Sequence, residues 1–280
     1  MTQAWQVGPL ALPYPLLITL AAIASGWFIG LRLARSAGLD AEPLLFRMLL
    51  VGLAAARLAF VWQWRGPYLG NPLAILDIRD GGWDAAAGIA AACLYGLYRV
   101  RHQSTLRRPV LVAVLTTGMV WTLGSFAITL RSRDAVPLPQ LSLPSLEGQT
   151  VSLAGYSGKP TVLNLWATWC PPCQREMPIL QHAQAADTDV NFVFINQGET
   201  AQTISRYLAR FELPLRNVLV DAQLQAGSIL GQRALPTTLF FDARGQLVDT
   251  RIGALSEATL AQRLSELRGA APTPPRLPFH

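Results

Sequence analysis

The stretch "LWATWCPPCQREMP", residues 165–178, holds two of the chain's three cysteines, Cys170 and Cys173. They follow an apolar run and are separated by two prolines, which suit the first turn of a helix. Two cysteines at this spacing can serve a metal site, a structural disulfide or a redox-active pair.

The other residues of the second half favour the redox pair. A structural zinc ion binds four side chains, and beyond residue 136 the only further Cys or His residues are His182 and His280. A disulfide between residues three apart closes almost no loop, so it constrains the unfolded chain little. The sequence therefore predicts a redox dithiol, with neither a metal nor a cofactor.

A helix that begins at Cys170 would explain its reactivity. Its sulfur would face unsatisfied backbone N–H groups and the positive end of the helix dipole, which favours the thiolate. Thiols in such motifs have a pKa of about 3.5 to 7.5, below the usual value near 8.5. We predict that Cys170 is the nucleophile and that Cys173, one turn inward, resolves the mixed disulfide.

Strand and helix signals alternate over residues 137–268. Strands are expected at 150–153, 161–167, 190–197 and 217–221, helices at 171–186, 200–213, 222–230 and 256–268, and a hairpin at 237–253 turning at Arg244-Gly245. Such an order predicts an α/β domain with a mixed sheet between helices. Residues 269–280 have the composition of a disordered tail.

Two motifs in this domain carry a resemblance: "WATWCPPC" at 166–173 and "ALPTT" at 234–238. The domain resembles the thioredoxin superfamily, and within it the membrane-tethered extracytoplasmic reductases of the TlpA/ResA/CcmG type. The resemblance implies a cis peptide at Leu235-Pro236, with Pro236 against the disulfide and the preceding backbone open to a substrate strand. The implied substrate-binding residues are Trp169, Pro171, Pro172, Leu235 and Thr237.

Two polar residues near the dithiol need interpretation. Asn164 stands where thioredoxins proper have a buried aspartate, and an amide cannot accept the resolving thiol's proton. Glu176 stands where the tethered reductases carry a glutamate, and if buried it would have a raised pKa and accept that proton. The alternative is a solvated carboxylate paired with Arg175. The expected catalytic set is Cys170, Cys173, Glu176 and Pro236; Trp166 is assigned to packing, Trp169 to a lid over Cys170, and His182 to the surface.

The first half differs in composition. Only 14% of all residues are charged, against about 25% in soluble chains, and the mean hydropathy is +0.30. Residues 1–136 hold 12 arginines and 6 acidic groups, whereas residues 137–280 hold 11 basic and 11 acidic groups. The arginines interrupt or flank apolar runs instead of forming a basic stripe on a soluble face, so nucleic-acid binding is not expected.

Four apolar segments predict an all-α bundle of about four transmembrane helices over residues 1–133. Residues 10–31 and 109–130 are uncharged and long enough to cross a bilayer. Residues 43–64 contain Arg47 and Arg57, and residues 85–98 are short. Cys93 in the short segment is interpreted as a small apolar residue, because a redox relay would need a second thiol.

Arginines in the short loops predict the orientation, since positive loops stay cytoplasmic. They are Arg32, Arg35, Arg99, Arg101, Arg107 and Arg108. With four spans both termini lie outside, which puts residues 137–268 in the periplasm of a bacterial inner membrane; with one span fewer the C-terminus would turn inward. No basic region precedes the first span, so it is expected to be a retained anchor.

The segments "AAARLAF" (54–60) and "RGPYLGNPLAILDIRDGGWDAAAG" (65–88) resemble the early membrane part of prolipoprotein diacylglyceryl transferase. The functional histidine of that family is replaced within residues 85–88, and its later Arg-Gly-Asn-type motif is missing. Without these ionisable groups transferase activity is not expected. Arg57 is left with two interpretations, a lipid-headgroup ligand or an arginine snorkelling or paired inside the bundle.

The predicted function is a membrane-anchored reductase of extracytoplasmic disulfides. Strong oxidants of the superfamily tend to have a histidine between the cysteines, and here there is none. The expected partners are protein thiols or disulfides, such as those of apocytochrome c or copper-site proteins, a separate membrane electron donor, and the lipid bilayer. The alternative is a non-catalytic lipid-binding or assembly scaffold that uses the domain to hold a client.

Overall fold

The computed structural model describes residues 4–7, 10–70, 72–77, 81–131 and 136–269. The chain divides into two compact units, a helical one over Leu12–Arg133 and one that combines Asp134–His280 with Met1–Ala11. The strands β1 (Ala4–Val7) and β2 (Leu10–Pro13) form a two-stranded sheet, and the boundary between the units falls within β2. Of the tail predicted at 269–280, Gly269 is the last residue of the C-terminal helix and residues 270–280 lie outside the described residues.

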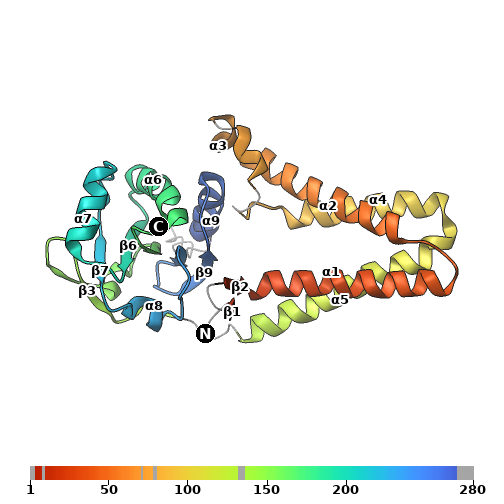
Figure 1. The fold of residues 1–280 in the computed structure, drawn as a ribbon, viewed down its shortest axis with the longest axis horizontal. Helices are drawn as coiled ribbons and strands as arrows, with labels where there is room; N and C mark the ends of the chain where they lie inside the picture. The colour runs from red at the N-terminus through yellow and green to blue at the C-terminus, as the bar shows by residue number, and fades with distance from the viewer. Residues whose placement is uncertain (1–3, 8–9, 71, 78–80, 132–135, 270–280) are drawn as a thin grey trace, which may run out of the picture. The chain divides into compact units, whose positions relative to one another are not determined.

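The helical unit is built from two helix pairs, α1 with α5 and α2 with α4 (Figure 1). Its elements are α1 (Tyr14–Ser36), α2 (Glu42–Gln63), α3 (Arg65–Gly70), η1 (Pro72–Leu76), α4 (Ala85–His102), η3 (Ser104–Leu106) and α5 (Arg107–Arg131). Glycines allow close backbone approach. A Cβ at Gly26 would lie 2.5 Å from the Ala113 carbonyl oxygen, and one at Gly88 would lie 2.8 Å from that of Gly52.

Three helices in the described part of the chain are long and apolar enough to cross a membrane: α1, α2 and Ser104–Leu130. The prediction of about four was therefore one too many. The third predicted span does form a helix, α4, which at 18 residues is longer than the expected segment. Its last turn contains Arg99, Arg101 and His102, which leaves the apolar part short.

The connections that carry the arginines lie at one end of the helical unit. The last turns of α1 and α4 share an apolar cluster with the first turns of α2 and α5, formed by residues that include Ala34, Leu44, Val100 and Val110. Figure 1 shows the α1–α2 and α4–α5 connections at this same end. The two loops that carry the arginines therefore lie at the same end of the helical unit.

The second unit contains a five-stranded mixed sheet in the order β7-β6-β5-β8-β9. Its strands are β5 (Thr161–Trp166), β6 (Asn191–Gln197), β7 (Val218–Asp221), β8 (Thr237–Phe241) and β9 (Leu247–Ile252). β5, β6 and β7 are parallel, while β8 is antiparallel to both β5 and β9. Every residue of β5 is buried, as in strands covered on both faces.

Alternate residues of β5 face two different layers. Val162 and Trp166 belong to the cluster formed with α6 (Pro171–Ala186), α7 (Ala201–Arg210) and α9 (Glu257–Gly269). Leu163 and Leu165 belong to the opposite cluster, with β3 (Ser142–Pro144), η4 (Leu153–Tyr156) and α8 (Gln225–Ile229). Asn164 alternates with Val162 and Trp166 along β5, so its side chain lies on the same face as theirs, the face covered by α6. This is the predicted helical bundle followed by a thioredoxin-like α/β fold.

Most element boundaries match the prediction within about three residues, with three differences. β3 was missed, although its partner β4 (Thr150–Ser152), which is equally short, was predicted. The helix expected to reach 213 ends at Arg210, and Glu212 has a φ of 52°. The helix expected from 222 begins at Gln225, because Leu224 has a left-handed φ of 59°.

Candidate active site

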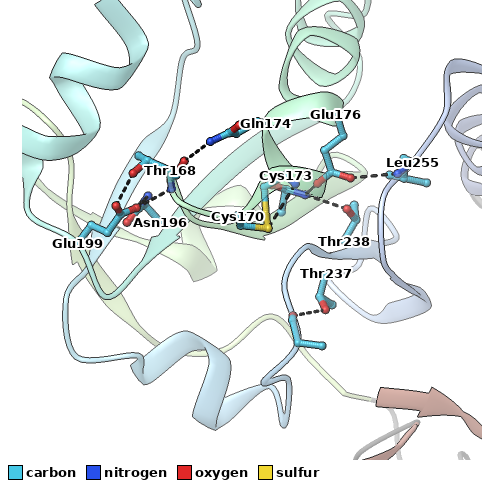
Figure 2. Close-up of a disulfide and its surroundings, with 12 residues drawn as sticks. Thr168, Cys170, Cys173, Gln174, Glu176, Asn196, Glu199, Thr237, Thr238 and Leu255 are labelled. Atoms are coloured by element: carbon cyan, nitrogen blue, oxygen red, sulfur yellow. Dashed lines mark hydrogen bonds between the residues drawn. A yellow bond between two sulfur atoms is a disulfide. The ribbon is translucent and has the colours of Figure 1, made fainter. Parts of the chain in front are cut away.

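A disulfide joins Cys170 and Cys173 at the point where β5 passes into α6 (Figure 2). Cys170 is the N-cap of α6, and its Sγ accepts a hydrogen bond from the Cys173 N–H at 3.3 Å. Pro171 and Pro172 occupy the first turn, where no intrahelical N–H is needed. Cys170 retains 3% of its surface and Cys173 none, so Cys170 is the sulfur that a partner can reach first.

Glu176 lies on α6 one turn after Cys173 and is fully buried. Its Oε1 accepts a hydrogen bond from Asn164 Nδ2 at 2.8 Å, and its Oε2 accepts one from the Leu255 N–H at 3.0 Å (Figure 2). The alternative of a solvated surface carboxylate was therefore wrong. Burial raises the pKa of Glu176 to about 7, against the lowering effect of these hydrogen bonds and of the Arg251 charge. The carboxyl group can thus gain or lose a proton near neutral pH.

Asn164 orients this carboxyl group from the sheet. Its amide Nδ2 also donates to Thr238 Oγ1 at 2.9 Å, directly across the β5–β8 pair. The Asn164 Oδ1 is buried and accepts no hydrogen bond. The amide cannot take a proton itself, but as a donor it helps to fix the group that can.

The peptide bond Leu235-Pro236 is cis, as the resemblance implied. It immediately precedes β8, where Thr237 Oγ1 donates to the Ala234 carbonyl at 2.7 Å and the Gly253 N–H donates to the Pro236 carbonyl at 2.9 Å. Pro236 and Thr237 are buried and Leu235 is half-buried. A substrate-binding role for this segment stays a prediction.

The two tryptophans of the motif differ in their exposure to solvent. Trp166 is fully buried and packs against Tyr207, with 5.6 Å between ring centroids. Trp169 is 66% exposed, and Pro171 beside it is also exposed. His182 is on the surface, as predicted. Trp169 and Pro171 thus offer an apolar surface next to Cys170.

The sequence interpretation missed a polar network on the other side of Cys170. Glu199 accepts hydrogen bonds from the Thr168 N–H at 2.7 Å, the Thr168 hydroxyl at 2.5 Å and Asn196 Nδ2 at 2.7 Å (Figure 2). Gln174 Nε2 donates to the Thr168 carbonyl at 2.7 Å. A signal was available: Thr168 follows β5 and Glu199 follows β6, and the carboxyl ends of parallel neighbours meet at one edge of a sheet.

Comparisons with known proteins show what each half of the chain is similar to. The family model described as Redoxin matches residues 133–264, and that of prolipoprotein diacylglyceryl transferase matches residues 2–127. The thiol:disulfide interchange protein DsbE of Pseudomonas fluorescens biotype C is 32% identical over 130 residues, which cover 46% of this chain and 72% of the relative. The thiol-disulfide oxidoreductase ResA of Geobacillus thermodenitrificans is 28% identical over 172 residues, 60% of this chain and 98% of the relative.

Among solved structures, one of MTB dsbF is 27% identical, with a TM-score of 0.44 over 46% of this chain and 95% of that chain. The fold and the dithiol define the class of thioredoxin-like redox proteins. Within it, the chain belongs to the ResA/DsbE family of thiol-disulfide oxidoreductases. It is therefore an enzyme whose substrates are protein thiols or disulfides, joined to a helical region that matches the transferase family.

Proposed function

We propose that this protein is a membrane-anchored reductase of disulfides in extracytoplasmic proteins. The observation that carries the proposal is a dithiol at the N-terminus of α6 beside a buried carboxyl group, Glu176, whose pKa is about 7. Residues 1–133 serve as the membrane domain and residues 137–268 as the redox domain. Client cysteines of cytochrome c maturation or of copper sites fit this activity.

The proposed reaction is two thiol–disulfide exchanges. The Cys170 thiolate attacks one sulfur of a client disulfide; the Cys170–client bond forms, the client S–S bond breaks, and one client thiolate leaves. Cys173 then gives its proton to Glu176 and attacks the Cys170 sulfur, which releases the second client thiolate. Two electrons pass to the client, and the Cys170–Cys173 disulfide is the oxidised product. Trp169 and the Leu235–Thr237 segment hold the client strand.

One feature favours reduction as the direction: no histidine lies between the cysteines to stabilise the thiolate further. A bacterial periplasm is kept oxidising by other proteins, which would tend to oxidise the dithiol. A reductase there has to be recharged from the membrane. Cys93 is the only cysteine before residue 170, so a separate membrane protein is the proposed electron donor.

The arrangement of the helical unit supports a periplasmic redox domain. The basic α1–α2 and α4–α5 connections lie at one end, which the distribution of positive charge assigns to the cytoplasm. α4 runs antiparallel to α2, since Gly96 packs on Met48 while Gly88 packs on Ala56. α5 therefore starts at the cytoplasmic end and leaves at the other. In this proposed orientation α4 carries the chain back to the cytoplasmic end, so it counts as a crossing although it is not one of the three described helices that are long and apolar enough by composition.

The helical unit acts in this proposal as an anchor without transferase activity. The hydrogen bonds of Arg57 to Ala74, Ile75, Asp77 and Gly82 go to backbone carbonyl oxygens. They favour a role inside the protein over binding of a lipid headgroup. The bilayer is a partner only in that it surrounds these helices.

Trapping of the mixed disulfide tests the proposal. We expect the reduced full-length Cys173→Ser variant in nanodiscs to form a mixed disulfide with disulfide-bonded insulin through Cys170, with release of one insulin thiolate, and the Cys170→Ser variant to form none. The wild-type protein should reduce insulin in the presence of dithiothreitol. An adduct at neither cysteine would refute the dithiol mechanism, and binding of insulin without its reduction would favour the scaffold.

A further inference from the structure

Thr168, two residues before Cys170, has each of its polar groups bound. Its N–H and hydroxyl donate to the two oxygens of Glu199, and its carbonyl accepts from Gln174 on α6 (Figure 2). The loop that leads from β5 to the nucleophile is thus tied on one side to α6 and on the other to the loop after β6. Because only Trp169 separates Thr168 from Cys170, a shift of Thr168 would move both residues.

Glu199 is itself held in place. Asn196, the residue before the last one of β6, donates from its Nδ2 to Oε2 of Glu199. Gly198 before it has a φ of 80°, which a side chain would strain, and Thr200 after it caps α7 by accepting from the Thr203 N–H. The Glu199 carboxylate is therefore a fixed point against which the β5–α6 loop is set.

This carboxylate also brings negative charge to the loop of the nucleophile. The reduced Cys170 attacks as the thiolate, and a nearby like charge disfavours that ionised form. A less stable thiolate makes the dithiol give up its electrons more readily, which lowers the reduction potential of the couple. The charge of Glu199 thus opposes the N-terminus of α6, which stabilises the Cys170 thiolate.

We infer that Glu199 is a positioning residue of the redox site: through Thr168 it sets the loop that carries Trp169 and Cys170, and through its charge it keeps the couple reducing. The inference rests on the proposed function in assigning the reductive direction. It adds a residue that lies about 30 positions from the Cys-Pro-Pro-Cys motif in sequence and touches the motif's flank in space.

The first test is Glu199→Gln in the full-length protein in nanodiscs, in a Cys93→Ala background. The dithiol is equilibrated with glutathione, and its reduced fraction and the pKa of the Cys170 thiol are measured by alkylation. We expect the equilibrium constant to shift about threefold to tenfold toward the reduced dithiol, up to roughly 30 mV in potential, and the thiol pKa to fall. Glu212→Gln, an exposed residue in the turn after α7, is the matched charge control and should change neither quantity.

The second test separates anchoring from charge. Thr168→Val removes the hydroxyl hydrogen bond and keeps the carboxylate, so we expect insulin reduction to slow several-fold while the potential stays unchanged. Thr168→Ser keeps the hydroxyl and should restore turnover. If Glu199→Gln does not fold, the two Thr168 variants decide. Slower insulin reduction in Thr168→Val with normal reduction in Thr168→Ser supports the anchoring role, and an unchanged rate in Thr168→Val overturns it.

Wild-type values of potential, thiol pKa and turnover in both Glu199→Gln and Thr168→Val would overturn the inference. The glutathione equilibrium needs no client. An enzyme that fails to reduce insulin, yet changes its potential in Glu199→Gln, would therefore contradict the proposed function and leave this inference standing.

Discussion

Among the described residues, each unit buries one charged side chain on a helix, Arg57 on α2 and Glu176 on α6, and the two side chains have different partners. Arg57 on α2 retains 7% of its surface and Glu176 on α6 retains none. Arg57 donates to the carbonyl oxygens of Ala74, Ile75, Asp77 and Gly82 at 2.8 to 3.1 Å. Glu176 accepts from one side-chain amide and one backbone N–H.

Arg57 and Glu176 differ in whether the side chain can gain or lose its charge. A guanidinium is always protonated in proteins. The Cζ atom of Arg57 lies 5.6 Å from the ring centroid of Tyr68 and 6.0 Å from that of Trp83. Arg57 is thus suited to hold the segment after α3 in one conformation. Glu176 has fewer donors, and burial raises its pKa to about 7. It is suited to exchange a proton during each catalytic cycle.

The largest expected effect is the loss of Arg57. In Arg57→Leu one buried and three part-buried hydrogen bonds to carbonyl oxygens are lost, and an acceptor left unsatisfied in a fully buried place costs about 1 to 3 kcal/mol. We expect a destabilisation of several kcal/mol, seen in nanodiscs as a lower unfolding temperature of the helical unit and as protease cleavage within residues 65–84. Insulin reduction per folded molecule should be unchanged.

Arg47→Leu is the control, because Arg47 lies on the same helix and is exposed. If the two variants were equally stable, the structural role of Arg57 would be wrong. If Arg57→Leu instead lost a copurifying phospholipid that Arg47→Leu retained, the headgroup interpretation would gain support. Native mass spectrometry distinguishes these results.

The next effect is the pH dependence that Glu176 gives to stability. Its pKa is about 7 in the folded protein and 4.5 ordinarily, so between these values the folded state binds the proton that the unfolded state has lost. The contribution of Glu176 to the free energy of unfolding should be largest below pH 4.5, fall by roughly 3 kcal/mol as the pH rises to 7, and be level above that. In Glu176→Gln this component should vanish, which makes the variant the more stable protein at pH 8.

The same substitution should slow the resolving step. A positioned proton acceptor contributes about a hundredfold or more, so decay of a preformed Cys170–client adduct should be slower in Glu176→Gln and should lose its rise with pH near 7. Glu257→Gln, outside the site, serves as the control. A wild-type pH profile of this step would show that another group accepts the proton.

The sequence predicted the parts of the site that are close together along the chain. Cys170, Cys173 and Glu176 fall on successive turns of one helix, so spacing alone places them near one another. The partners of Glu176 could not be predicted in this way. Leu255 is 79 residues further on, and its approach depends on how α9 packs on the sheet, which no local pattern encodes.

The same limit explains the missed and corrected features elsewhere. Glu199 reaches Thr168 only because β5 and β6 are parallel neighbours, a pairing that the strand signals allow without specifying. The number of spans was overestimated because α4 has apolar composition but ends in charged residues. Arg57 kept two interpretations because its carbonyl partners belong to an irregular segment whose path the sequence does not specify.

The smallest expected effect is that of Cys93→Ala. If one unit holds its charge fixed and only the other exchanges protons and electrons, the helical unit should take no part in redox chemistry. Cys93 is a free cysteine on an exposed face of α4, and electron transfer by thiol–disulfide exchange through the helical unit would require a second thiol to pair with it. Insulin reduction, the glutathione equilibrium of Cys170–Cys173 and recharging by isolated membranes should all match the wild type. Slower recharging in Cys93→Ala, with an unchanged glutathione equilibrium, would mean that the donor passes electrons through an intermolecular disulfide at Cys93, and the division between a fixed and a reactive unit would fail.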